Sequence, residues 1–527
     1  MGIKNIKLNI KILFIIFFIF GINSVKDYGM SYDELEYRQQ GFIVLNHLGE
    51  KFFPKKTEQI KTQRELNYPT FEQYFGEIKN NLKIQHTFYA LVEFIFQKNE
   101  KEKRNVYKLR HYLNFIFFFI SLIYFYKLLR IFFDRYLCCI GTLLYFLTPR
   151  IFANAFYNPN DIFFLIFLMI NVYYGLIFYK KEQFKNLVLM SLFTVLSLNV
   201  RIIGIYFYFI FIFIFLIFSL KDNKKINYKF LSFQFLLIVF LIYLFTPQIW
   251  GSSFFELTDL FIGQLKYAAI DPEILFRDKM YIASNLPWYY IYYWILITSP
   301  LIILVFFVIG LVYLIKNYPK IFDKNSKEYF LFVIFLTLLA PLVSLLIFKP
   351  SIYNGWRQFY FIWPYILILG IYGIDILFKF GRYTKFTINV FLFLSIVYQA
   401  NWNFSNHPYQ NVYFNYFGSQ INSRFEYDYW GLSNLEAYEK ILENENDSFK
   451  IKPLGGSRID FALNLLSNQK KNRIELLKPS AKEKPDFYIT TFNDGNSFEF
   501  YIKNNFREYY SIKVDGIKIN SIFTKDF

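Results

Sequence analysis

The sequence predicts an all-α polytopic membrane domain followed by a small α/β domain outside the membrane. The 527 residues are 55% hydrophobic, with a mean hydropathy of +0.26, and the apolar residues gather into long runs. A soluble chain of this length would instead divide into domains with polar faces between them. Short Lys/Arg-rich segments separate the runs, and the composition becomes mixed and polar from residue 401 onward. We therefore predict a transmembrane domain at 1–400 and an extramembrane domain at 401–527.

The apolar runs predict about eleven transmembrane helices, because each approaches the roughly 20 residues that cross a bilayer. Little more than Arg201 separates the fifth from the sixth. The first run follows several lysines without a small-residue cleavage site, which favours an uncleaved span over a signal peptide. The spans are expected at 9–25, 111–132, 136–149, 161–179, 186–200, 202–220, 229–246, 291–315, 329–348, 358–378 and 386–400.

The distribution of charge orients these spans. A net charge of +18 could indicate a nucleic-acid binder, but residues 401–527 hold 16 basic and 16 acidic side chains, so the whole excess lies in the membrane part. Cytoplasmic loops carry such an excess of Lys and Arg. With the N-terminus inside, alternation places five basic segments on the inner side, which explains the charge without nucleic acid. These segments are 127–135, 180–185, 221–229, 316–327 and 379–385.

The first outside loop, 26–110, is more than a linker. Residues 32–48 and 84–97 both carry apolar side chains at helical spacing, as at Ile84, Phe88, Leu91 and Ile95. We expect two amphipathic helices in the membrane interface, joined by a polar connector around Lys51–Lys83.

The tail mixes helix-like and strand-like segments, which predicts a small α/β domain on the outside. Asp515-Gly516 is typical of the tight turn of a β-hairpin. Helices are expected at Leu435–Asn444 and Ile459–Asn468, and strands at Phe449–Pro453, Arg473–Leu477 and Asp486–Thr491.

Few charges lie on the outer side of the spans, and they fall in one layer. The carboxylates could deprotonate a hydroxyl group, and arginines suit bidentate binding of phosphate. Single charges at a membrane boundary are often only anchors whose heads reach water, whereas charges facing a cavity at this depth indicate function. The layer consists of Asp33, Glu34, Asp161, Arg150, Arg201, Lys349 and Arg357.

Two of these residues have a purely structural alternative. Ser31-x-x-Glu34 is a capping box, in which the two side chains satisfy free N–H groups at a helix start. Asp33 would then only favour the positive end of the helix dipole. The acids could also hold a hard divalent cation through oxygen, but nothing in the sequence requires a metal or other cofactor. Cys138 and Cys139 are adjacent within an apolar run and lack metal-site spacing.

The order and membrane side of these residues resemble the GT-C glycosyltransferases, over roughly residues 9–400. Within them, the chain is most similar to protein O-mannosyltransferases and bacterial aminoarabinose transferases of lipid A. The Asp33-Glu34 pair opens the first outside loop as in that family, and Asp161 looks like its second acidic position. The segments that carry the resemblance are Pro149-Arg150-Ile151-Phe152, Asn158-Pro159-Asn160-Asp161, Leu198-Asn199-Val200-Arg201-Ile202-Ile203-Gly204 and Trp356-Arg357-Gln358-Phe359-Tyr360-Phe361 with Pro364.

The resemblance implies an inverting transfer of one sugar from a polyprenyl-phosphate donor to an acceptor hydroxyl of a protein, lipid or glycan. Asp33 would be the general base, supported by Glu34. The donor phosphate would be bound by Arg201 and Arg357, with Arg150 as a further candidate. The remaining implied residues, Asp161 and His86, would orient the acceptor or a basic neighbour. The family also implies a bacterial inner membrane, with the active site and the C-terminal domain periplasmic or extracellular.

Two other classes of protein remain open. A polytopic transporter or lipid-carrier flippase would also have many spans, but such proteins tend to place polar groups near the bilayer midplane within inverted repeats. Here the charges gather at the outer boundary, and no repeat is evident. In a structural or assembly protein, the tail would bind a partner and the acids would only cap a helix.

Overall fold

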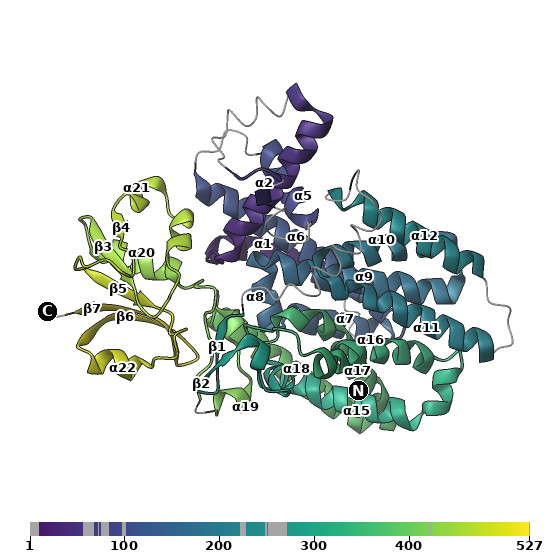
Figure 1. Cartoon of the computed structure of the whole chain (residues 1–527). Coiled ribbons are helices and arrows are strands. Elements are labelled where there is room, and N and C mark those ends of the chain that lie inside the picture. Colours follow the sequence, from purple (N-terminus) through teal and green to yellow (C-terminus); the bar gives the residue numbers. More distant parts are fainter. Residues whose placement is uncertain are drawn as a thin grey trace.

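A computed structural model of the chain describes residues 10–55, 68–71, 73–74, 84–96, 102–221, 228–247, 250, 271–421 and 423–525. A large helical part is joined to a smaller domain that contains a β-sheet (Figure 1). Much of the connector expected around Lys51–Lys83, together with residues 251–270, lies outside the described residues.

Each of the eleven predicted spans coincides with a helix or with a pair of helices. The apolar runs of the sequence predict the positions of these helices well. A segment within a bilayer must satisfy its own backbone hydrogen bonds, and a helix does so. The helices are α1 (Ile10–Ser24), α6 (Lys103–Leu129), α7 (Arg135–Phe146), α9 (Pro159–Lys181), α10 (Phe184–Val200), α11 (Tyr206–Lys221), α12 (Tyr228–Leu244), α14 (Tyr290–Thr298) with α15 (Leu301–Lys316), α16 (Lys327–Phe348), α17 (Trp363–Leu377) and α18 (Arg382–Ser405).

The number of helices that cross the membrane stays a prediction. By length and composition, four described helical segments suffice to span a bilayer, or up to six if two bent pairs each form one span. Three further apolar helices, which include α10 and α12, are shorter. The eleven-span count therefore goes beyond what helix length alone supports.

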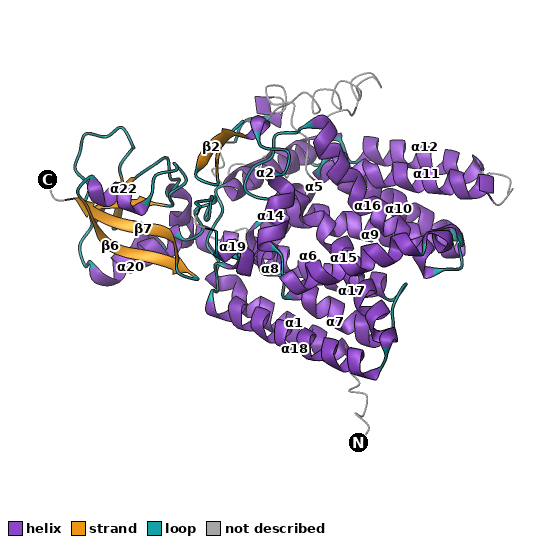
Figure 2. Cartoon of the chain, turned by 90° about the horizontal axis from the view of Figure 1, so that it is seen from below, coloured by secondary structure: helices purple, strands orange, loops and turns teal. Residues whose placement is uncertain are grey.

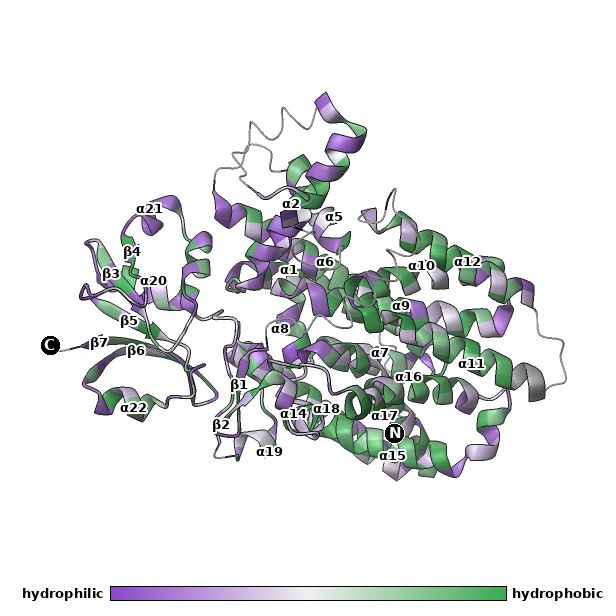
Figure 3. Ribbon diagram, viewed as in Figure 1, coloured by the Kyte–Doolittle hydropathy of each residue, from purple (hydrophilic) through white to green (hydrophobic). Residues whose placement is uncertain are grey.

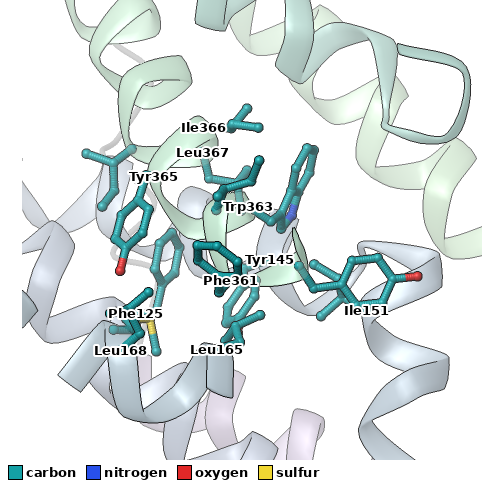
Figure 4. Packing of buried hydrophobic residues seen from close by; sticks show 14 of the residues in the cluster. Phe125, Tyr145, Ile151, Leu165, Leu168, Phe361, Trp363, Tyr365, Ile366 and Leu367 are labelled. Atoms are coloured by element: carbon teal, nitrogen blue, oxygen red, sulfur yellow. The ribbon is translucent and has the colours of Figure 1, made fainter. Parts of the chain in front are cut away.

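Two helices form the centre of the bundle. In the most apolar stretches of α9 and of α17 with the turn before it, 78% and 83% of the residues are buried. A helix that is apolar on all sides is stable only where neighbours or lipid cover every side. Side chains of α17 such as Trp363 and Tyr365 pack with Leu165 and Leu168 of α9 and with Phe125 of α6 (Figure 4). At the edge, α1 runs beside α18 (Figure 2), where the rings of Phe20 and Phe404 are 4.8 Å apart.

Two breaks in the bundle differ from straight spans. Helix α7 is followed by α8 (Pro149–Tyr157) at an angle of 62°, and α14 meets α15 at 118°. The predicted span 291–315 is therefore sharply bent. Pro149 occupies the first turn of α8, where its missing N–H costs nothing. Pro300 lies between α14 and α15, and proline restricts the residue before it to extended backbone, which ends a helix.

The outside loop contains the two expected helices, α2 (Asp33–Phe52) and α5 (Ile84–Phe96). Helix α5 exposes Phe88, Leu91 and Ile95 and buries His86 and Glu93. Exposure of the apolar face and burial of the polar face is the reverse of a water-soluble helix, and it is the pattern expected where lipid covers the outer side. The first loop thus presents polar side chains to the interior of the protein.

The C-terminal part agrees closely with the predicted elements. Its sheet has the order β4-β3-β5-β7-β6, with β3 parallel to both neighbours and β7 antiparallel to β5 and β6. The hairpin turn falls at Asp515 and Gly516, which both have positive φ. The second expected helix is a short 3₁₀ turn over Asp460–Leu465. The elements are α20 (Asn434–Asn444), β3 (Phe449–Pro453), β4 (Ile474–Leu476), β5 (Phe487–Thr490), α22 (Phe498–Lys503), β6 (Phe506–Val514) and β7 (Ile517–Lys525).

The helical part is dominated by hydrophobic residues and the C-terminal domain is mixed (Figure 3). A short hairpin, β1 (Glu273–Phe276) with β2 (Lys279–Ile282), lies between them and was not predicted. Phe276 of this hairpin bridges to Phe425, in the segment that leads to α20.

We expect the contact of α15 with α17 to tolerate alanine at Gly370 but not at Gly373. A Cβ at Gly373 would lie 2.2 Å from the carbonyl oxygen of Phe306, whereas one at Gly370 would lie at an ordinary 3.4 Å from that of Ile303. Overpacking of this kind costs about 1–3 kcal/mol, and small residues permit close helix approach in membranes. Thermal unfolding in detergent should show a lower midpoint for Gly373→Ala than for Gly370→Ala. Equal midpoints would contradict this packing.

Candidate functional site

Asp33 is the first residue of α2 and is half-buried. Its Oδ2 accepts two hydrogen bonds, one from the Tyr37 hydroxyl and one from Nε1 of Trp430, each at 3.1 Å. Burial and the charge of Asp33 raise the pKa of Tyr37, so that hydroxyl keeps its proton and donates it. Among the described residues no hydrogen bond reaches Oδ1, which leaves that oxygen for a further proton.

Glu34 is buried, and its side chain binds Ser31 at the start of α2. Its Oε1 accepts from the backbone N–H and the hydroxyl of Ser31, at 2.8 and 3.2 Å, and its Oε2 contacts Nε2 of His111 at 2.9 Å. This is half of the predicted capping box, because the glutamate satisfies the Ser31 N–H while the serine hydroxyl caps no N–H group. Glu34 therefore fixes the turn that presents Asp33.

Asp161 joins two arginines from other helices. It lies in the first turn of α9, where the side chain of Asn158 caps the helix and donates to Oδ2 at 2.8 Å. Its other oxygen forms an ion pair with Arg201, at the C-terminal end of α10, and Oδ2 also accepts from Nη1 of Arg357 at 2.9 Å. A buried carboxylate needs such partners. These ion pairs hold the start of α9, the end of α10 and the turn before α17 next to one another.

Arg150 is a buried cation without a carboxylate partner among the described residues. It lies on α8, donates from Nε to the carbonyl of Tyr413 at 3.0 Å, and rests against the rings of Trp294 and Phe414, at 5.1 and 5.2 Å. Such ring contacts stabilise a cation but do not neutralise it.

Arg150 and Arg357 line one small polar cavity of about 20 Å³, which is room for about one water molecule. Of these two arginines, Arg357 shares the carboxylate of Asp161 with Arg201, and Arg150 has no carboxylate partner among the described residues, so positive charge at the cavity is left unpaired. Such a site favours an anion. The cavity is lined by Arg150, Asn154, Asn354, Arg357, Tyr360, Asn411, Tyr427, Tyr429 and Trp430.

The other predicted residues lie differently. His86 is buried on α5 and stacks on Tyr37, with ring centroids 4.5 Å apart. It therefore packs against the tyrosine that donates a hydrogen bond to Asp33, and it does not line the cavity. Lys349 is exposed at the end of α16 and also lies outside the cavity lining. The three acids do not fit a cation site, since Asp161 faces arginines and Glu34 faces Ser31 and His111. Within the described chain no three His, Cys, Asp or Glu side chains group as metal ligands.

The sequence analysis missed the residues that the tail contributes. The run Phe425–Trp430 holds four aromatic and two acidic side chains at the start of an otherwise polar region, and this composition was the available signal. Trp430 contacts Asp33 and covers Arg357, whose guanidinium carbon is 4.7 Å from the ring. Glu426 is 6% exposed, and burial raises its pKa to about 8.

Comparison with known proteins supports the resemblance that the sequence indicates. Residues 109–250 match the family described as dolichyl-phosphate-mannose-protein mannosyltransferase. This stretch runs from α6 to beyond α12 and includes Arg150, Asp161 and Arg201. It covers about a quarter of the chain, and over that part it confirms the resemblance to GT-C glycosyltransferases. With the apolar helices, it identifies an integral, multi-pass membrane protein.

No curated protein matches the chain. Two solved structures of an oligosaccharyltransferase from Archaeoglobus fulgidus are distantly similar. One is the apo form, at 12% identity and a TM-score of 0.41, with 74% of this chain and 55% of that chain covered. The other is AglB with an inhibitory peptide and a dolichol-phosphate, at 12% identity and a TM-score of 0.48, with coverages of 88% and 65%. The chain therefore spans less than two thirds of either structure.

We expect Glu426→Gln to stabilise the protein increasingly as pH rises. Between the ordinary value of 4.5 and about 8, the folded protein holds the Glu426 proton and the unfolded chain does not. The free energy of unfolding of the wild type therefore falls as pH rises through this window, and glutamine removes that loss. Thermal unfolding at about pH 5 and pH 9 should show the larger gain at pH 9. The exposed Glu443→Gln is the control, and an equal response of both variants would contradict the burial argument.

Proposed function

We propose that the protein transfers one sugar from a polyprenyl-phosphate donor to an acceptor hydroxyl, with inversion, on the outer face of the membrane. The observation that supports the proposal is that Asp33, whose Oδ1 accepts no hydrogen bond among the described residues, lies in the same site as arginines whose positive charge is only partly paired. The match over residues 109–250 supports glycosyl transfer as the reaction class.

Asp33 is the general base of this reaction. Its Oδ1 takes the acceptor proton while the acceptor oxygen attacks the anomeric carbon of the sugar, and the bond from that carbon to the phosphate oxygen breaks. The polyprenyl phosphate leaves with the electron pair. Attack opposite to the leaving group inverts the configuration. A positioned base typically contributes 10²–10⁴-fold to such a reaction.

Arg357 and Arg150 bind the phosphate of the donor, and Arg201 adds charge beside them. Their guanidinium groups stabilise the negative charge that grows on the phosphate as the bond breaks. A phosphate is larger than the present cavity, so its walls widen when the donor binds. Asp161 holds Arg201 and Arg357 in place and does not touch the acceptor. His86 acts only through Tyr37.

The charge pattern of the inner segments supports an outer location for the site. Because Asp33, Arg201 and Arg357 lie on the side opposite the five basic segments, the site and the C-terminal domain face the periplasm or the exterior of a bacterial inner membrane. Acceptors from a protein, a lipid or a glycan all present hydroxyl groups to this side.

We expect Asp33→Asn to lose at least 100-fold in sugar transfer at unchanged protein level. Membranes with wild type, Asp33→Asn, Ser31→Ala and Asp27→Asn would be supplied with radiolabelled polyprenyl-phosphate sugars. Ser31→Ala removes the hydroxyl that donates to Glu34 at 3.2 Å and to the carbonyl of Tyr157 at 3.4 Å, a loss of about 1 kcal/mol, and keeps the backbone N–H bond to Glu34. Asp27→Asn is the matched carboxylate in the same loop, where it pairs with His407. Both controls should retain transfer. Donor left unconsumed by wild type, or activity retained in Asp33→Asn, would refute the proposal.

We expect Arg150→Gln to raise the KM for the donor without lowering the unfolding temperature. Arg150 is a buried charge without a carboxylate partner, and removal of such a charge relieves a desolvation cost. Donor titrations and thermal unfolding of the same preparations would separate the two effects. An unchanged KM, or a fall in both stability and activity, would assign Arg150 to the fold alone.

A further inference from the structure

The segment 423–433 connects the membrane helices with α20 and passes over the candidate site. Its turn is held by Asp428, whose carboxylate accepts from the N–H groups of Leu432 and Ser433 at 2.9 and 2.8 Å. Gly431 has a φ of +69°, which glycine adopts without strain. The segment also lies against the first loop, since a Cβ on Gly29 would be 2.1 Å from the carbonyl oxygen of Leu432.

Trp430 is the residue of this segment that touches both halves of the site. Its Nε1 donates to Oδ2 of Asp33 at 3.1 Å, and its ring lies 4.7 Å from the guanidinium carbon of Arg357. The ring also meets Tyr157 edge-on at 5.3 Å. With 5% exposure, the indole has little freedom to turn. One rigid side chain therefore fixes the carboxylate relative to the cation.

The C-terminal domain holds this segment from the other side. Asn520 of β7 donates to the Ser433 hydroxyl and to Oδ1 of Asn434, at 2.9 and 2.8 Å. Asn493, which follows β5, donates to the carbonyl of Asp428 at 3.3 Å. The place of Trp430 thus depends on the sheet, although no strand residue touches Asp33 or Arg357 in the described contacts.

We propose that Trp430 is a positioning residue for sugar transfer and that the C-terminal domain completes the active site through it. The inference rests on the proposed function. With Oδ2 engaged by Trp430 and Tyr37, the carboxylate is turned so that Oδ1 meets the acceptor hydroxyl. The indole face also shields Arg357 from water, which strengthens its attraction for a phosphate. Such pre-set geometry lowers the barrier because no reorientation is needed during the reaction.

The test compares Trp430→Phe with Trp402→Phe. Trp402 is equally buried at 5% exposure, and its Nε1 donates to an aspartate, Asp515, at 3.4 Å, away from the site. Trp430→Phe is expected to lower kcat about tenfold, the effect of losing one hydrogen bond of average strength, with the KM for the donor unchanged because a ring still covers Arg357. Trp402→Phe should keep wild-type kcat.

The kcat and KM values, measured per folded molecule, separate positioning from simple loss of stability. Trp430→Phe should lower kcat while the KM for the donor stays at the wild-type value, and Trp402→Phe should change neither. Asn493→Ala loosens the segment without touching the site, and it should lower kcat while the KM for the donor is retained. If Trp430→Phe fails to fold, Asn493→Ala carries the test.

The outcomes distinguish this inference from the proposed function. If wild type transfers sugar and Asp33→Asn does not, but Trp430→Phe matches Trp402→Phe in kcat, the positioning role is refuted and the function stands. Increased activity of Trp430→Phe would also refute it, since the indole would then restrain the base. If wild type transfers no sugar, the proposed function fails first.

Discussion

The buried ion pairs of Asp161 are the interaction on which the rest of the site depends. Arg201 and Arg357 come from segments far apart in the sequence, and both meet one carboxylate in the first turn of α9. Charges at this depth are costly unless paired, so each helix end is fixed in register with the others. The apolar packing of α9 and α17 provides rigidity, but apolar contacts alone would allow the helices to slide. The ion pairs select one arrangement.

That arrangement leaves the charges unequal, and the imbalance is what a phosphate would use. Arg150 contacts aromatic side chains, the carbonyl of Tyr413 and the cavity, and among the described residues it has no carboxylate partner. A protein that binds no anion has no evident reason to keep such a cation buried, because its removal would stabilise the fold. A negatively charged donor would pair with this guanidinium and so offset the free energy that its desolvation costs in the free protein.

The sequence predicted the helices and most strands well, because apolar runs and alternation reflect local constraints. It also placed Asp161, Arg201 and Arg357 in one layer, since topology brings the outer ends of helices together. It missed the bend between α14 and α15, although Pro300 marks that position, and it read the Ser31–Glu34 capping box as complete when only the glutamate half forms. Trp430 lies 397 residues from Asp33 in the chain, and no local pattern predicts so distant a contact.

The place of Trp430 also bears on how the chain divides into domains. A boundary at 400/401 follows composition, yet α18 continues to Ser405, and Phe414, Phe425 and Trp430 pack in the same hydrophobic cluster as the membrane helices. Trp402 and Tyr409, by contrast, belong to the cluster of the sheet. The two cores therefore interleave along residues 402–432. Because residues 402–432 pack in both cores, the position of the C-terminal domain is fixed relative to the membrane helices. The domain thereby also fixes Trp430, which contacts Asp33.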